Sequence, residues 1–165
     1  MKTTLLSLML LLSTSIFADM FTSDSKIWGD VGGIIAPSGP IFIAGGSLNY
    51  QKKTIHYKLK AGAEHYGDDN YMKYYHIDIL AGKQFTVNDY MNISLLTGLG
   101  VINIEKSPYD LEQDSQRFFK TFSIPIELEF MVHLKYVGVG FNLYYEFNTV
   151  SQLVGANFKI AFGNM

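Results

Sequence analysis

The feature that most constrains the fold of this sequence is a sustained alternation of apolar and polar residues. Across residues 55–64, every second residue is apolar, and the residues between them are polar or glycine. Residues 121–132 repeat the split, with an apolar residue at every even position. Successive side chains point to opposite faces of a β-strand, whereas an α-helix repeats every 3.6 residues. The period of two therefore predicts β-strands whose two faces meet different surroundings.

Eight segments with this pattern follow one another, and turn residues separate them. They cover residues 27–35, 41–50, 55–64, 74–85, 91–104, 121–132, 137–147 and 154–162. Strands that cross a bilayer at a tilt contain about 9–11 residues, whereas typical soluble strands contain about five or six. An even number of strands allows an antiparallel barrel to close. The chain is therefore predicted to be all-β, an eight-stranded antiparallel up-and-down transmembrane β-barrel.

Alternation does not by itself say which face points outward. A soluble lipocalin-like barrel also alternates, but its apolar face points inward. Here charged residues make up only 17% of the chain, and small residues such as Gly62, Gly138 and Gly140 are common on the polar faces. A wall exposed to water would carry more Lys and Glu. We therefore expect the apolar faces to contact lipid and the polar faces to fill a narrow lumen. A soluble periplasmic lipocalin-like binding barrel is the alternative.

The N-terminus has the composition of a secretory signal peptide. Lys2 precedes a mostly apolar run, residues 5–12, and small polar residues then lead to Ala18. An uncleaved membrane anchor needs about 20 apolar residues, so the shorter run is expected to be removed after Ala18. The expected organisation is a signal peptide at residues 1–18 and an outer-membrane barrel domain at residues 19–165. The expected location is the outer membrane of a Gram-negative bacterium.

The connections between the segments support this arrangement. A barrel with both termini in the periplasm alternates short inner turns with outer loops. Residues 51–54, 87–90 and 133–136 are short connections at inner positions, whereas the longest connection, residues 105–117, falls at an outer position. This long segment is polar and acidic, as expected for an external loop.

With these features the chain resembles the superfamily of eight-stranded outer-membrane barrels, which includes the outer-membrane protein A transmembrane domain and the opacity-type surface proteins. The resemblance covers nearly the whole mature chain. In the last strand, an insertion signal for the outer-membrane machinery is expected at Gly155, Phe158, Ile160 and Phe162. The chain departs from the common pattern by ending at Met165 in place of an aromatic residue. The resemblance implies two partners, the outer-membrane lipids and the insertion machinery.

Charged residues on the polar faces are expected to meet inside the lumen. They are Lys58, Lys60, Glu64, Asp78, Glu127, Glu129, Glu146 and Lys159. Isolated charges would be costly to bury, so we expect them to pair and to plug the narrow interior. Lys58 and Lys60 are expected to form a closed network with Glu127 and Glu129, in which Lys60 and Glu129 are energetically coupled. A conducting or gated pore is the alternative interpretation of the same residues.

No motif in the sequence predicts catalysis, a metal site or a cofactor. The sequence has no close motif of a nucleophilic Ser, a His and an acid. The histidines have other places in the pattern: His56, His76 and His133 fall on polar faces or turns, and His65 falls near a strand end. The acidic segment at residues 68–70 lacks further metal ligands and suits a turn. With no cysteine, thiolate metal sites and disulfides are excluded. The net charge of -2, without a long charged block, argues against nucleic-acid binding.

Three classes of function are therefore compatible with the sequence. A structural or surface-interaction barrel with a polar, plugged lumen is favoured, and its surface ligand is not identified. A lipid-modifying outer-membrane enzyme is an alternative that the missing catalytic residues disfavour. A small pore or apolar-ligand transporter is an alternative that lumen filling disfavours.

Overall fold

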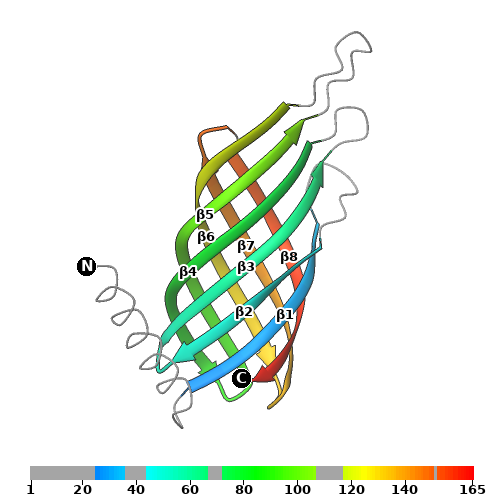
Figure 1. Cartoon of the computed structure of the whole chain (residues 1–165). Helices are drawn as coiled ribbons and strands as arrows, with labels where there is room; N and C mark the ends of the chain where they lie inside the picture. The colour runs from blue at the N-terminus through cyan, green and yellow to red at the C-terminus, as the bar shows by residue number, and fades with distance from the viewer. Residues whose placement is uncertain (1–24, 36–43, 67–71, 107–116, 151) are drawn as a thin grey trace, which may run out of the picture.

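The computed structural model describes residues 25–35, 44–66, 72–106, 117–150 and 152–165. These residues form eight strands: β1 (Ser25–Ile35), β2 (Ala44–Lys52), β3 (Ile55–Tyr66), β4 (Met72–Asn88), β5 (Met91–Lys106), β6 (Arg117–His133), β7 (Val137–Asn148) and β8 (Gln152–Asn164). Each strand pairs antiparallel with its neighbours in sequence, and β1 pairs with β8 to close the barrel. Figure 1 shows the strands wound around the barrel at a steep tilt. Within the described ranges, no helix has the length and apolarity to cross a membrane.

The predicted strands and short turns are confirmed. Each of the eight expected segments overlaps one strand, although β4 and β6 are longer than expected, at 17 residues each. The short connections, residues 53–54, 89–90 and 134–136, lie at one end of the barrel. The predicted signal peptide, the acidic segment at residues 68–70 and most of the long acidic connection lie outside the described residues.

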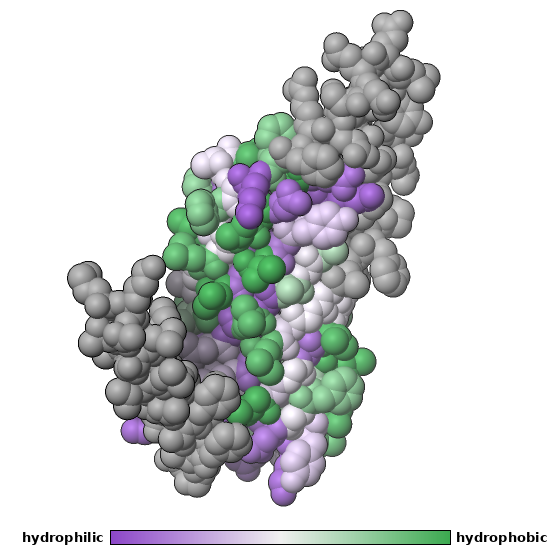
Figure 2. All heavy atoms as spheres, in the orientation of Figure 1, coloured by the Kyte–Doolittle hydropathy of each residue, from purple (hydrophilic) through white to green (hydrophobic). Residues whose placement is uncertain are grey.

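The outer wall of the barrel is apolar. Its exposed large side chains come from every strand and include Val31, Leu48, Leu59, Ile77, Ile79, Leu99, Phe122, Ile126, Val139, Leu143, Phe158 and Ile160. Figure 2 shows hydrophobic side chains over much of the visible wall. Soluble monomers rarely expose so large a continuous apolar surface. The apolar faces therefore point outward, as expected, and the lipocalin-like alternative is wrong.

Glycines on the inner faces allow the walls to approach one another and the lumen side chains to fit. A Cβ at Gly82 would meet the carbonyl oxygen of Leu95, and one at Gly98 would meet that of Ile79, so β4 and β5 come close at both positions. A Cβ at Gly62 would meet the imidazole of His76. These positions therefore exclude larger residues because of the close packing around them.

The orientation of the wall can be tested by placing a charge on it. Ile79 is 69% exposed in the middle part of β4, and Leu134 is 68% exposed in a turn between β6 and β7. Ile79→Arg is expected to cost about 2–4 kcal/mol of folding free energy in lipid vesicles, because mid-membrane burial of Arg is unfavourable. The matched control Leu134→Arg should cost about 0–1 kcal/mol near the interface. Equal costs in urea titrations would contradict this placement.

Candidate functional site

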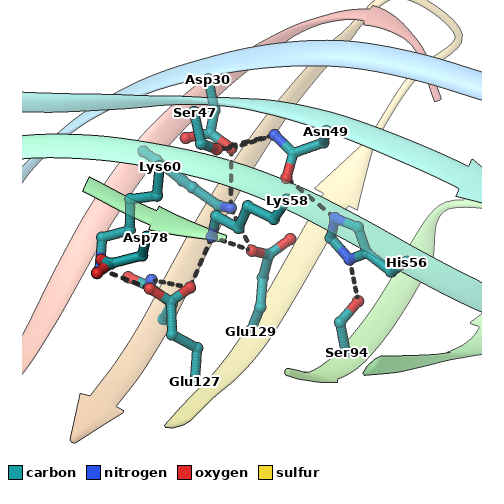
Figure 3. A network of polar contacts seen from close by, with 12 residues as sticks. Asp30, Ser47, Asn49, His56, Lys58, Lys60, Asp78, Ser94, Glu127 and Glu129 are labelled. Carbon is teal, nitrogen blue, oxygen red and sulfur yellow. Dashed lines mark hydrogen bonds and ion pairs between the residues drawn. The ribbon is translucent and has the colours of Figure 1, made fainter. Parts of the chain in front are cut away.

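The centre of the lumen holds a network of ion pairs between β3 and β6. Lys58 and Lys60 lie two residues apart on β3, and Glu127 and Glu129 lie two residues apart on β6, so each pair points inward from its strand. The Lys58 ammonium lies 2.7 Å from Glu127 Oε2 and 2.9 Å from Glu129 Oε2. The Lys60 ammonium lies 2.5 Å from Glu127 Oε1. All four side chains are buried (Figure 3).

A third lysine extends this network to β1 and β8. Lys159 Nζ lies 2.5 Å from Glu129 Oε2 and 3.1 Å from Asp30 Oδ2. Asp30 Oδ2 also accepts hydrogen bonds from the Ser47 hydroxyl at 2.7 Å and from the Asn49 amide at 2.8 Å. Figure 3 shows these groups converging from several strands. We call Lys58, Lys60, Lys159, Asp30, Glu127 and Glu129 the lysine network. The sequence pattern did not predict the role of Asp30.

The structure defines the individual pairs of the expected network. The ion pair of Lys60 is with Glu127, and Glu129 pairs with Lys58 and Lys159. Lys60 and Glu129 are therefore linked through Lys58, which bridges the two carboxylates, and energetic coupling between them stays a prediction. The side chain of Glu64 lies outside the described residues.

Asp78 and Glu146, which were expected in the same network, lie instead beside His76. The Nδ1 atom of His76 lies 2.7 Å from Asp78 Oδ2. One potential ligand atom from each of the three residues lies within 4.8 Å of the others, and all three side chains are buried. The lumen charges therefore divide into the lysine network and this second group.

Neutral polar side chains continue the lumen toward the end with the short turns. His56 contacts Asn49 Oδ1 through Nε2 at 2.9 Å and Ser94 Oγ through Nδ1 at 3.2 Å. His133 Nε2 lies 2.7 Å from the amide of Asn92. Both imidazoles are thus held in hydrogen-bonded pairs within the packed lumen.

Two clusters of buried apolar side chains lie in the lumen, one toward each end. The outer cluster contains Tyr74, Ile102, Ile104, Tyr144 and Leu153, and the inner cluster contains Trp28, Met131, Ala161 and Met165. Sequence reasoning assigned polar character to the inward faces and missed these clusters. Around Ile102 and Ile104 of β5 the inward residues are apolar and the outward Asn103 and Glu105 are polar, so the expected alternation is reversed there.

The expected insertion signal lies in β8. Phe158, Ile160 and Phe162 are exposed on the outer wall, where they can contact lipid. Gly155 faces inward, and a Cβ there would meet the ring of Tyr144. Beyond them the chain turns inward, since Gly163 has a φ of 142° and Met165 is buried among lumen residues. Recognition of these residues by the insertion machinery stays a prediction.

Solved structures with a similar fold are outer-membrane barrels. The N-terminal β-barrel domain of Pseudomonas aeruginosa OprF has a TM-score of 0.63 at 17% identity, covering 85% of this chain and 97% of that one. Neisserial surface protein A has a TM-score of 0.61 at 13% identity, covering 85% and 97%. Yersinia pestis Ail has a TM-score of 0.56 at 15% identity, covering 86% and 97%. The likeness to these structures shows that the chain has the fold of a small eight-stranded β-barrel.

Comparison of sequences adds no closer relationship. A scan against protein-family models found no match, and a search of curated proteins found none either. Because the sequence identities are below one fifth, the structural likeness establishes the fold alone. The function has to be argued from the residues of this chain.

The lysine network can be tested by a double-mutant cycle. Lys159→Met and Glu129→Gln are each expected to lower the free energy of unfolding by about 3–5 kcal/mol, because each leaves a buried charge without its partner. Combined, they should show a coupling of about 0.5–3 kcal/mol in urea unfolding from lipid vesicles. The control cycle of Lys60→Met with Glu129→Gln should couple more weakly, since that pair is not in contact. Additive effects in the first cycle would remove Lys159 from the network.

Proposed function

We propose that this protein is a small outer-membrane barrel with a structural or surface-interaction role, and that its lumen does not conduct ions. The observation that carries the proposal is the filling of the lumen along its length. The lysine network occupies the centre, and the outer and inner apolar clusters lie toward the two ends. An ion would have to break buried ion pairs and pass both clusters, which is strongly unfavourable.

The proposal places the interaction surface at the outer end of the barrel. Loops on a rigid scaffold are common sites of binding. The outer wall of the barrel faces lipid, so it is not available to a surface ligand. Catalysis is not part of the proposal, because the buried histidines of the described lumen are engaged by Asn49, Ser94, Asp78 and Asn92. A nucleophilic Ser activated by a His on the lipid-facing wall would be needed for lipid modification.

The ligand of a surface interaction need not match that of a structural neighbour. Ail from Yersinia pestis has been solved in complex with the heparin analogue sucrose octasulfate. The longest outer connection of this chain contains Glu105, Asp110, Glu112 and Asp114 and is acidic overall. Because like charges repel, we do not extend binding of a sulfated polyanion to this protein.

Because its lumen is filled, the protein is expected to show no ion conductance. The refolded protein in planar lipid bilayers is expected to give no steady conductance, because the apolar clusters and the lysine network block the lumen. Tyr144 belongs to the outer cluster, whereas Tyr145 lies on the outer wall. Because the lysine network and the inner cluster still fill the lumen, Tyr144→Ala and the neighbouring control Tyr145→Ala are both expected to stay silent. A stable, ion-selective conductance of the unmodified protein would overturn the proposal and favour the pore.

Export through the predicted signal peptide gives a second test. The mature protein is expected to begin near Asp19 and to fractionate with the outer membrane, with heat-dependent mobility on gels. Leu10→Arg interrupts the apolar run and should leave an uncleaved precursor, whereas Thr3→Ser should be processed normally. N-terminal sequencing measures the cleavage site. Recovery of the mature chain in the soluble periplasm would contradict the location.

A further inference from the structure

A second group of titratable side chains lies in the lumen beside the lysine network. His76 and Asp78 project inward from β4, and Glu146 reaches them from β7, which is not a neighbour of β4 in the sheet. One nitrogen or oxygen atom from each lies within 4.8 Å of the others. The three side chains can therefore converge on a single small ion.

Buried oxygen atoms in this group lack hydrogen-bond partners. Asp78 is 0% exposed and Glu146 is 1% exposed, yet Oδ1 of Asp78 and Oε1 of Glu146 have no partner. Oγ of Ser123 is also buried without one. A Cβ at Gly100 would meet both Asp78 Oδ1 and Ser123 Oγ, so the glycine keeps the space at these oxygens open. Such orphaned oxygens are strongly unfavourable unless a cation or a proton satisfies them.

The balance of charge in the lumen points to a cation. Among the buried side chains of the described residues, five carboxylates oppose three lysines, an excess of two negative charges. Lys60 lies opposite Asp78 in the register of β3 and β4, but its ammonium bonds to Glu127 and lies over the Tyr144 ring, 4.6 Å from its centroid. One divalent cation beside Asp78 and Glu146 would balance the excess.

We propose that His76, Asp78 and Glu146 bind one divalent transition-metal ion of the Zn²⁺ type inside the barrel. Zn²⁺ takes His nitrogen and Asp or Glu oxygen as ligands, and water can fill the fourth position. The imidazole favours Zn²⁺ over Mg²⁺ and Ca²⁺, which prefer oxygen ligands alone. His76 also lines a small cavity in the lumen. The ion would tie β4 to β7, whatever the barrel does at the surface.

Metal binding can be measured on the barrel in detergent, after the unfolded chain has been freed of metal with EDTA. Because the folded lumen is filled, Zn²⁺ or Co²⁺ is supplied during refolding: metal analysis is expected to give one Zn²⁺ per chain, and Co²⁺ in its place should give d–d absorption bands. Asp78→Asn and Glu146→Gln should weaken binding by more than the roughly 10- to 100-fold seen for outer-shell partners. The exposed turn residue Asp89 provides the control, and Asp89→Asn should bind as the unmodified protein does.

Unfolding in urea distinguishes a metal ion bound by Asp78 and Glu146 from a proton shared between their two carboxyl groups. Zn²⁺ should raise the urea midpoint of the unmodified barrel and leave the urea midpoint of Asp78→Asn unchanged. Without metal, Asp78→Asn should be at least as stable as the unmodified barrel, because the substitution removes one of the two neighbouring negative charges of Asp78 and Glu146. Binding that Asp78→Asn and Glu146→Gln do not weaken would overturn the proposal. So would a barrel that binds neither Zn²⁺ nor Co²⁺ and gains stability only on acidification. The Co²⁺ spectrum needs only the unmodified protein, so the test holds even where a variant fails to fold.

Discussion

The structure depends on the satisfaction of backbone hydrogen bonds inside hydrocarbon. A bilayer offers no water to an unpaired amide or carbonyl group, so an open sheet edge is excluded there. Pairing of β1 with β8 removes both edges over residues 27–35 and 156–164. Closure then determines the environment of each strand residue. Eight strands enclose only a narrow interior, so a side chain faces either the lipid or the lumen.

The two surroundings select residues by different rules. The wall needs apolar side chains and tolerates many of them, since Ile, Leu, Val and Phe contact lipid equally well. The lumen needs side chains that satisfy one another within a small space. Its polar groups therefore lie in chains of contacts, as where Asp30 accepts bonds from Ser47, Asn49 and Lys159. Loss of one member leaves the others unsatisfied.

This difference explains how much could be predicted from the sequence. Alternation identified all eight strands and the outward apolar face, because lipid acts on every second residue of a strand. It did not identify Asp30 as a network member, since glycines at positions 29, 32 and 33 weaken the pattern of β1. The four residues Lys58, Lys60, Glu127 and Glu129 could be predicted to meet, but their individual pairs depend on strand tilt and register, which give Lys60 the partner Glu127. The inward-facing Ile102 and Ile104 were missed because the alternation is reversed in that part of β5, where the outward residues are Asn103 and Glu105.

The lysine network also supplies contacts that the strand pairing cannot. Ladder hydrogen bonds join only neighbouring strands, and they leave the cross-section of a barrel free to flatten. Lys58 and Lys60 connect β3 to β6, and Lys159 connects β8 to β6, so both links join strands that are not neighbours. In a low-dielectric interior these pairs lose strength steeply when they separate. The network therefore resists flattening of the barrel, and a rigid cross-section holds the outer ends of the strands at fixed spacing for the loops that they carry.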